Sequence, residues 1–180
     1  MELKGSKTEA NLMAAFSGES MARNKYTYYA SRARKDGFEQ IALIFEETAN
    51  NEKEHAKLWF KLLHDGGVPG TEANLVDAAA GENYEHDVMY ADFAKVAREE
   101  GFNNIATLFD GVGRVEKDHA DRYEKLLENL RNERVFEKNA PIVWYCSNCG
   151  HLHEGTKAPK MCPVCVHPQA YFYQKSDNYK

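Results

Sequence analysis

The sequence lacks cysteine over its first 145 residues, and all four of its cysteines lie within the last 35. A disulfide framework is rarely confined to one end of a protein from a reducing compartment, so this distribution argues against structural disulfides. Long apolar runs are also missing, and none approaches the roughly 18 residues that a membrane-spanning helix needs. The first residues contain no apolar stretch before a small-residue cleavage site. We therefore expect no secretory signal, no membrane partner and a cytoplasmic location.

An excess of basic charge is absent as well. The 180 residues carry 23 Lys plus Arg against 28 Asp plus Glu, which gives a net charge of −5. Binding of nucleic acid through general charge needs the opposite balance, so we expect no nucleic-acid partner. The 43% apolar content suits a packed core, and the length suits one domain of ordinary size with a second, small one.

Apolar residues that recur at steps of three and four predict a mainly α fold. The predicted helices cover residues 8–35, 38–64, 81–99 and 102–132. Residues 66–80, which contain two Gly and then Pro-Gly, are expected to form a long connection. Such a crossover would let the second and third helices run parallel in a four-helix bundle, as in ferritin-like folds.

The helical region contains an internal repeat. Residues 32–63 fall on residues 96–127 without a gap, and 14 of the 32 positions are identical. Glycine, phenylalanine, glutamate and histidine positions all match, which a shared Leu/Ala pattern alone does not explain. The bundle is therefore expected to consist of two helical hairpins related by a pseudo-two-fold axis.

The repeated hairpins each carry one Glu-x-x-His motif. Glu52 with His55, and Glu116 with His119, have the i, i+3 spacing that places both side chains on one helical face. One such motif alone is usually a solvated pair. Two copies on otherwise apolar faces, at the period of the repeat, favour a metal site instead.

The other two helices supply further carboxylates, namely Glu19 on the first and Glu82 with Glu85 on the third. Unpaired carboxylates in an apolar core would cost several kcal/mol each, whereas a pair of cations satisfies them. Glutamates from two helices with Glu-x-x-His from the other two form the pattern of dimetal carboxylate proteins. This oxygen-rich ligand set suits iron or manganese.

Two tyrosines match in the repeat, Tyr26 and Tyr90. Tyr26 lies two helical turns from Glu19 on the same face, within reach of a hydrogen bond to a ligand carboxylate. Ordinary core packing accounts for both residues equally well. The remaining histidines, which lack such surroundings, are expected on the surface or in loops: His64, His86, His151, His153 and His167.

The cysteines form two Cys-x-x-Cys pairs separated by 12 residues. They are Cys146, Cys149, Cys162 and Cys165. This spacing predicts a single tetrahedral four-thiolate site. Zinc would make it a structural ribbon, and iron would make it a one-electron carrier. The aromatic, short segment around it is expected to be a small β module, so we divide the chain at 1–138 and 139–180.

Taken together, the chain resembles rubrerythrins over essentially its whole length. The resemblance rests on Gly18-Glu19-Ser20, on both Glu-Lys-x-His segments, on Gly81-Glu82-Asn83-Tyr84-Glu85 and on the cysteine-bearing tail. It implies a ferritin-like bundle with a non-haem di-iron centre and a rubredoxin-like module that binds one iron. Val166, which stands where a glycine usually follows the last cysteine, departs from ordinary rubredoxins.

The resemblance also implies residues and an activity. The di-iron ligands would be Glu19, Glu52, His55, Glu82, Glu85, Glu116 and His119, all but Glu82 also counted as catalytic, and Glu85 and His55 would exchange at one iron with its redox state. The reaction would be the reduction of hydrogen peroxide to water. Electrons would come ultimately from NAD(P)H, through a rubredoxin or an NAD(P)H-dependent reductase and then through the four-cysteine iron.

Helix length complicates that relay within one chain. Glu116 lies about 16 residues before the predicted end of its helix, which corresponds to about 24 Å. We therefore expect a homodimer or larger assembly in which electrons pass between subunits. Two other functions stay open at this point. One is a ferroxidase that handles iron, and the other is a non-catalytic binding module with a zinc ribbon.

Overall fold

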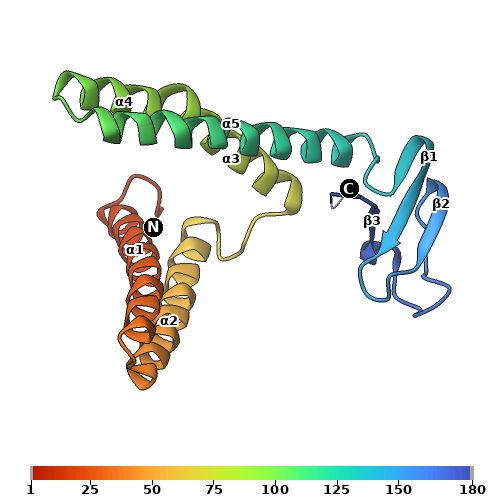
Figure 1. The fold of residues 1–180 in the computed structure, drawn as a ribbon, viewed down its shortest axis with the longest axis horizontal. Helices are drawn as coiled ribbons and strands as arrows, with labels where there is room; N and C mark the ends of the chain where they lie inside the picture. The colour runs from red at the N-terminus through yellow and green to blue at the C-terminus, as the bar shows by residue number, and fades with distance from the viewer. Residues whose placement is uncertain (1, 179–180) are drawn as a thin grey trace. The chain divides into compact units, whose positions relative to one another are not determined.

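The computed structural model describes residues 2–178, which divide between Pro69 and Gly70 into two compact units. Residues 1, 179 and 180 lie outside the description. The fold is mainly α with one small antiparallel sheet, as the sequence predicts (Figure 1). Within the described residues, no helix is both long and apolar enough to cross a membrane.

The first unit is a helical hairpin of α1 (Lys7–Lys35) and α2 (Glu39–Leu63), drawn in red to orange in Figure 1. Ser6 caps α1 by accepting a hydrogen bond from the Glu9 backbone N–H at 3.1 Å, while the Glu9 carboxylate accepts from the Gly5 N–H. Gly37, with φ of +87°, ends the helix because glycine adopts this left-handed conformation without steric cost. The bounds of both helices agree with the predicted ranges to within one residue.

Small residues form the seam between the two helices. Ala42, Ala49 and Ala56 recur every seven residues along α2 and are almost fully buried, as are Ala30 and Ala33 on α1. Side chains of this size let two backbones approach closely. The bulky apolar residues of α2 therefore lie off the seam, and several remain exposed within the hairpin.

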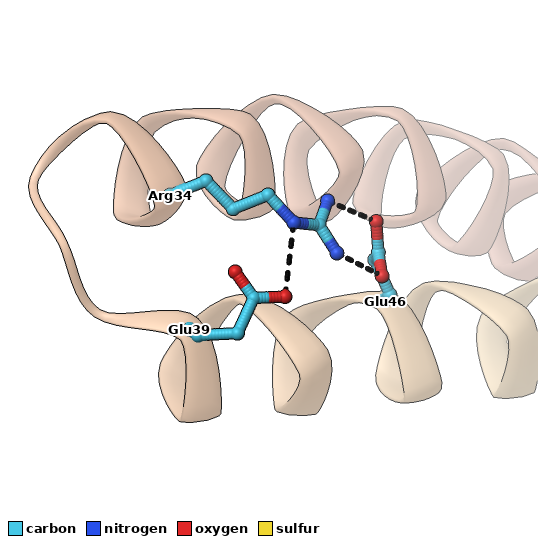
Figure 2. A network of polar contacts seen from close by, with 3 residues as sticks. All are labelled: Arg34, Glu39 and Glu46. Atoms are coloured by element: carbon cyan, nitrogen blue, oxygen red, sulfur yellow. Dashed lines mark hydrogen bonds and ion pairs between the residues drawn. The ribbon is translucent and has the colours of Figure 1, made fainter.

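An arginine ties the two helices together near the turn that joins them. The Arg34 guanidinium donates to both carboxylate oxygens of Glu46, at 2.5 and 2.6 Å, and to Glu39 at 3.3 Å (Figure 2). The hydrogen bonds from Arg34 lower the pKa of Glu46. The two-pronged pairing fixes the register of α1 against α2.

The second unit begins with a second hairpin. α3 (Thr71–Tyr84), a π-helical turn (Glu85–Met89) and α4 (Tyr90–Glu99) follow one another and pack on α5 (Asn103–Arg131). Its buried small residues repeat those of the first hairpin: Ala94, Ala97, Ala106, Gly113 and Ala120. Arg98 pairs with Asp110 at the positions of Arg34 and Glu46. The predicted hairpin repeat is confirmed at the level of packing and ion pairing.

The long connection predicted at 66–80 is wrong. α3 begins at Thr71, so the segment between α2 and α3 is only His64–Gly70. Residues 71–80 lack glycine and proline, and their alanines favour helix. Gly66 and Gly67 do end α2, with Gly66 at φ +88°, but the break extends no further than Gly70. The third helical stretch is correspondingly ten residues longer at its start than predicted.

The C-terminal module is a three-stranded antiparallel sheet in the order β2-β1-β3. The strands are β1 (Glu137–Cys146), β2 (Leu152–Lys157) and β3 (Phe172–Gln174), with a 3-10 turn at Gln169–Tyr171. Pro141 lies in β1 where the register with β2 shifts, a place that tolerates a missing N–H. Trp144, fully buried, donates from Nε1 to the Gly155 carbonyl at 3.0 Å and packs beside Cys146, Cys162 and Phe172.

A larger side chain in the alanine seam is expected to destabilise the first hairpin. Ala49 is 2% exposed, so Ala49→Leu forces α1 and α2 apart and should lower the free energy of unfolding by about 1–3 kcal/mol. Urea unfolding followed by far-ultraviolet circular dichroism measures this. The control is Ala10→Leu at an exposed position of α1. Equal midpoints for the two variants would show that the seam is not closely packed.

Candidate metal centres

The first hairpin brings three predicted ligands together. Glu19 from α1 lies beside Glu52 and His55 from α2, with one ligand atom of each within 4.8 Å of the others. His55 Nδ1 is 2.8 Å from Glu52 Oε2 and 3.8 Å from Glu19 Oε1. Glu52 is 17% exposed at its side chain, so two carboxylates and an imidazole converge in a partly desolvated place.

The second hairpin repeats this arrangement. Glu82 from α3 lies beside Glu116 and His119 from α5, again with ligand atoms within 4.8 Å. His119 Nδ1 is 2.8 Å from Glu116 Oε2 and 3.5 Å from Glu82 Oε2. Each hairpin thus carries one half-site of two carboxylates and one imidazole. We call them the α1–α2 half-site and the α3–α5 half-site.

Glu85 extends the second half-site. Burial raises the pKa of its carboxyl, and the neighbouring carboxylates of Glu116 and Glu82 raise it further. Three carboxylates that repel one another in a partly buried place are stabilised by a cation. This donor set, rich in oxygen with one imidazole, fits the hard, imidazole-tolerant ions iron and manganese. The residues of both half-sites therefore fit a pair of bound metal ions.

The π-helical turn at Glu85–Met89 explains where the extra carboxylate comes from. Glu19 and Tyr26 are seven residues apart in α1, whereas their counterparts Glu82 and Tyr90 are eight apart. The π turn, in which the Tyr90 N–H donates to the Glu85 carbonyl, accommodates the additional residue. Helix prediction missed this turn. The change in repeat offset from 63 to 64 residues is the sequence signal that locates it.

The two tyrosines occupy matching aromatic clusters. Tyr26 lies against Phe45, with ring centroids 6.1 Å apart, and Tyr90 lies against Phe109 at 6.0 Å. Burial raises the pKa of Tyr90, and the carboxylates of Glu85, Glu116 and Glu82 add to this rise. The Tyr90 hydroxyl therefore lies within electrostatic reach of the α3–α5 half-site. A role for either tyrosine beside a ligand stays a prediction.

The histidine predictions need one correction. His86 lies in the π-helical turn and not in a loop, and its Nδ1 is 2.7 Å from the Gly113 carbonyl on α5. Gly113 also lets Tyr90 approach α5 closely, since a Cβ at this position would lie 3.2 Å from Tyr90 Cβ. His86 thus ties the π turn to α5. The sequence alone gives no spacing rule that identifies it.

The four cysteines form the third cluster. The sulfur of Cys146 is 3.7 Å from that of Cys165, and the sulfur of Cys149 is 3.6 Å from that of Cys162. A tetrahedral ion with metal–sulfur bonds of about 2.3 Å requires sulfur–sulfur edges of about 3.8 Å. The observed edges fit one tetrahedral ion without rearrangement.

Each Cys-x-x-Cys pair sits in the same turn. The N–H of Gly150 donates to the Cys146 carbonyl, and the N–H of Val166 donates to the Cys162 carbonyl. The pKa of the Cys165 thiol is lowered to about 6, chiefly by a hydrogen bond from the backbone N–H of His167. The His151 N–H acts in the same sense on Cys149, but burial and hydrogen bonds with the other cysteines raise that pKa to about 12. Full ionisation of the cluster therefore calls for a metal cation.

Val166 carries strain that glycine would remove. It has φ of +61°, a conformation that is unfavourable for a β-branched residue, whereas Gly150 at φ +77° occupies the matching position of the first turn. Val166→Gly should stabilise the iron-bound module by about 1 kcal/mol, because relief of strain exceeds the added flexibility of the unfolded chain. The midpoint for loss of the visible iron–thiolate band in denaturant measures this.

The matched control for that substitution is Gly150→Ala, where a Cβ would meet Tyr145 only at ordinary contact distance. It should destabilise the module by about 1 kcal/mol through backbone strain alone. If Val166→Gly lowered the midpoint, the side chain of Val166 would contribute more than its backbone costs.

The family model described as Rubrerythrin matches residues 10–127, and that of the rubrerythrin rubredoxin-like domain matches residues 144–173. A rubrerythrin of Porphyromonas gingivalis is 49% identical, with 98% of this chain and 94% of that protein covered. Rubrerythrin-1 of Clostridium acetobutylicum is 47% identical, with 98% of each chain covered. A structure titled as the partially reduced state of nigerythrin is 32% identical, covers 97% of this chain and 88% of its own, and has a TM-score of 0.37.

Proposed function

Because the chain belongs to the rubrerythrin family, we propose that it is a non-haem di-iron peroxidase that reduces hydrogen peroxide to water. Family membership makes it an oxidoreductase of oxidative-stress defence with a ferritin-like fold, a di-iron site and a rubredoxin-like four-cysteine iron site. The observation that best supports the peroxidase proposal is the combination of two matched carboxylate–imidazole half-sites with a four-thiolate cluster in one chain.

Each hairpin supplies two carboxylates and one imidazole to the proposed di-iron ligands, and the second hairpin adds one further carboxylate. They are Glu19, Glu52, His55, Glu82, Glu85, Glu116 and His119. We propose domain limits of 1–138 for the bundle and 139–180 for the four-cysteine module. Cysteines that are all committed to one metal site suit a reducing compartment, so the cytoplasm is the proposed location.

Reduction of peroxide to two waters takes two electrons and two protons. When bound, two ferrous ions supply both electrons and Lewis-acid contacts to both oxygens. Glu52 and Glu116, the least exposed carboxylates of the half-sites, would hold the two cations together with the other glutamates. His55 and His119 would complete the ligand set. As neutral ligands they would leave the carboxylates to balance the charge.

The four-thiolate module is proposed to return electrons one at a time. Thiolate ligands suit a one-electron iron centre, and the donor is proposed to be a rubredoxin or an NAD(P)H-dependent reductase. α5 continues 15 residues beyond Glu116, about 22 Å at 1.5 Å per residue. A module that serves the bundle of a neighbouring subunit avoids this distance, so the proposed assembly is a homodimer or larger.

A single-turnover experiment tests the function. The iron-loaded protein is reduced without oxygen and mixed in a stopped-flow instrument with peroxide or with oxygen, while the visible band of the four-cysteine iron is followed. The proposal expects the band to return at least about tenfold faster with peroxide. Faster oxidation by oxygen, with uptake of added ferrous iron, would instead support the ferroxidase function. Absence of the band in a zinc-loaded native protein would support the binding module.

A further inference from the structure

The position of one extra residue decides which way Glu85 faces. α3, the π turn and α4 together contain one residue more than the matching part of α1, as the repeat offsets of 63 and 64 show. Glu82 and Glu85, three residues apart, share a helical face only if the extra residue lies after Glu85. If the helix accommodated it before Glu85, the Glu85 side chain would turn by about 100° about the helix axis, because an α-helix has 3.6 residues per turn. Its carboxylate would then leave the face that carries Glu82.

In the structure the extra residue lies after Glu85. The π-helical turn begins at Glu85, and the Tyr90 N–H donates to the Glu85 carbonyl. In this register Glu85 is half-buried, and burial raises the pKa of its carboxyl, as do the nearby charges of Glu116 and Glu82. The Glu85 carboxylate therefore faces the α3–α5 half-site.

The helical backbone alone does not determine this position. A single π turn replaces i→i+4 hydrogen bonds by i→i+5 bonds over one turn, wherever along the helix it forms. Backbone hydrogen bonding therefore distinguishes little between a π turn that starts at Glu85 and one that starts a residue or two earlier. Side-chain contacts with α5 have to make the choice.

His86 makes such a contact from the residue that follows Glu85. Its Nδ1 donates to the Gly113 carbonyl of α5 at 2.7 Å, and its side chain is only 31% exposed. A helix carbonyl has two lone pairs, so it can accept this hydrogen bond beside its helical one. With the extra residue before Glu85, His86 would turn away from α5 and lose the bond. The bond is therefore made only when the extra residue follows Glu85.

The contact also joins two ligand-bearing helical segments close to the half-site. Gly113 lies three residues before Glu116 on α5, and His86 lies directly after Glu85. The hydrogen bond thus connects the two backbones within one helical turn of both carboxylates. At the other end of the π turn, Tyr90 lies so close to α5 that a Cβ at Gly113 would be 3.2 Å from the Tyr90 Cβ. The π turn is therefore held against α5 at both of its ends.

The first hairpin lacks both the π turn and the residues of this contact. α1 is an uninterrupted α-helix over its described length. Ala49 of α2 occupies the position of Gly113, and His86 is matched by Arg23 or by Ala22, depending on the offset. The histidine, the glycine and the π turn therefore occur together in the hairpin that has the additional carboxylate.

We propose that His86 is a positioning residue for Glu85: its hydrogen bond to the Gly113 carbonyl selects the helix register in which the Glu85 carboxylate faces the α3–α5 half-site. The inference rests on the di-iron assignment of the proposed function and not on the choice of substrate. It assigns His86 no contact with metal or with peroxide. Loss of the hydrogen bond is expected to release Glu85 from the half-site while the fold of the hairpin persists.

A matched pair of substitutions tests the hydrogen bond. His86→Leu removes the donor, whereas His86→Asn has the same branched shape as leucine and places an amide N–H near the position of Nδ1. Backbone hydrogen exchange of residues 85–90 is followed by mass spectrometry on the full iron-loaded chain. It should be about fivefold faster in His86→Leu, the size of effect that loss of one hydrogen bond produces, and within about twofold of wild type in His86→Asn. Equal exchange in the two variants would overturn the role of the hydrogen bond.

Mössbauer spectra of the oxidised di-iron centre test the consequence for Glu85. If His86 acts through Glu85, His86→Leu should change the di-iron signal in the same way as Glu85→Ala, and the two substitutions together should change it no further. His86→Asn should retain the wild-type signal. A wild-type di-iron signal in His86→Leu, together with accelerated exchange, would show that Glu85 keeps its place without the hydrogen bond and would overturn the proposal.

The controls separate this result from unfolding and from a failed metal assignment. Each variant should keep its helical circular dichroism and one four-cysteine iron per chain, and His86→Ala provides a second donor-free variant with high helix propensity if the leucine variant does not. His64→Leu removes the same kind of hydrogen bond in the other hairpin, from Nδ1 to the Phe60 carbonyl at 2.8 Å, and should leave both readouts unchanged. The same changes in His64→Leu would overturn the specific role of His86. If the wild-type protein held no di-iron centre, the proposed function would be at fault, whereas hydrogen exchange would still decide the role of the hydrogen bond.

Discussion

The double substitution Glu116→Ala with His119→Ala is expected to abolish peroxide reduction while the four-cysteine iron remains fully loaded. These two side chains lie 2.8 Å apart in the α3–α5 half-site, and their removal leaves only Glu82 and Glu85 as ligands there. Two carboxylates that repel each other do not retain a metal pair against water. The rate of peroxide consumption should fall by at least about a thousandfold, as expected when groups that act as a unit are removed.

Metal analysis and the visible band accompany that measurement. The control, Lys117→Ala with Asp121→Ala, removes an exposed ion pair on the same helix and should leave the rate within about twofold. Peroxide consumption above a tenth of the wild-type rate in the ligand variant would place the reaction elsewhere in the molecule. Loss of the four-cysteine iron in the same variant would instead indicate general unfolding.

Replacement of iron by zinc in the four-cysteine cluster is expected to stop multiple turnover without harming the first. Zinc takes the same tetrahedral four-thiolate geometry but has no accessible redox change. The observed sulfur–sulfur distances of 3.6 and 3.7 Å suit either ion, so the module should keep its fold. With a one-electron donor, steady-state turnover should fall at least about a hundredfold, because electrons no longer reach the bundle through the module.

The matched measurement is a single turnover of the same zinc-substituted protein. After chemical reduction of the di-iron centre, one addition of peroxide should oxidise it at a rate within about twofold of the iron form. Equal steady-state rates for the zinc and iron forms would show that the donor delivers electrons directly to the bundle. A slowed single turnover would mean that the module also shapes the di-iron site.

The sequence predicts which candidate ligands lie together, because the chemistry of metal binding imposes their spacing. Glu-x-x-His on a helix places both groups on one face, and a second copy 64 residues later made the half-sites recognisable without coordinates. The structure brings together Glu19, Glu52 and His55, and likewise Glu82, Glu116 and His119. The Cys-x-x-Cys pairs are an equally specific pattern, because only certain spacings let four cysteines surround one tetrahedral ion.

Connections and helix irregularities were harder to predict. The glycines at 66 and 67 gave a correct end for α2, but the modest helix preference of residues 71–80 was not enough to predict that α3 already begins at Thr71. Helix propensity is a weak local preference, and the apolar residues take on a regular helical spacing only after the first turns of α3. The π turn at Glu85–Met89 is stabilised by packing on α5, including the contact of His86 with the Gly113 carbonyl. The change in repeat offset shows that one residue is inserted, and the packing on α5 determines that the insertion forms a π turn.

The order in which the two kinds of iron are oxidised tests the central claim most directly. The fully reduced protein is titrated without oxygen with less than one equivalent of peroxide, frozen at set times, and examined by Mössbauer spectroscopy, which distinguishes the di-iron and four-thiolate signals. The account predicts that the di-iron signal is oxidised first and that the four-thiolate signal follows as electrons return to the bundle. Oxidation of the four-thiolate iron while the di-iron signal stays ferrous would contradict it.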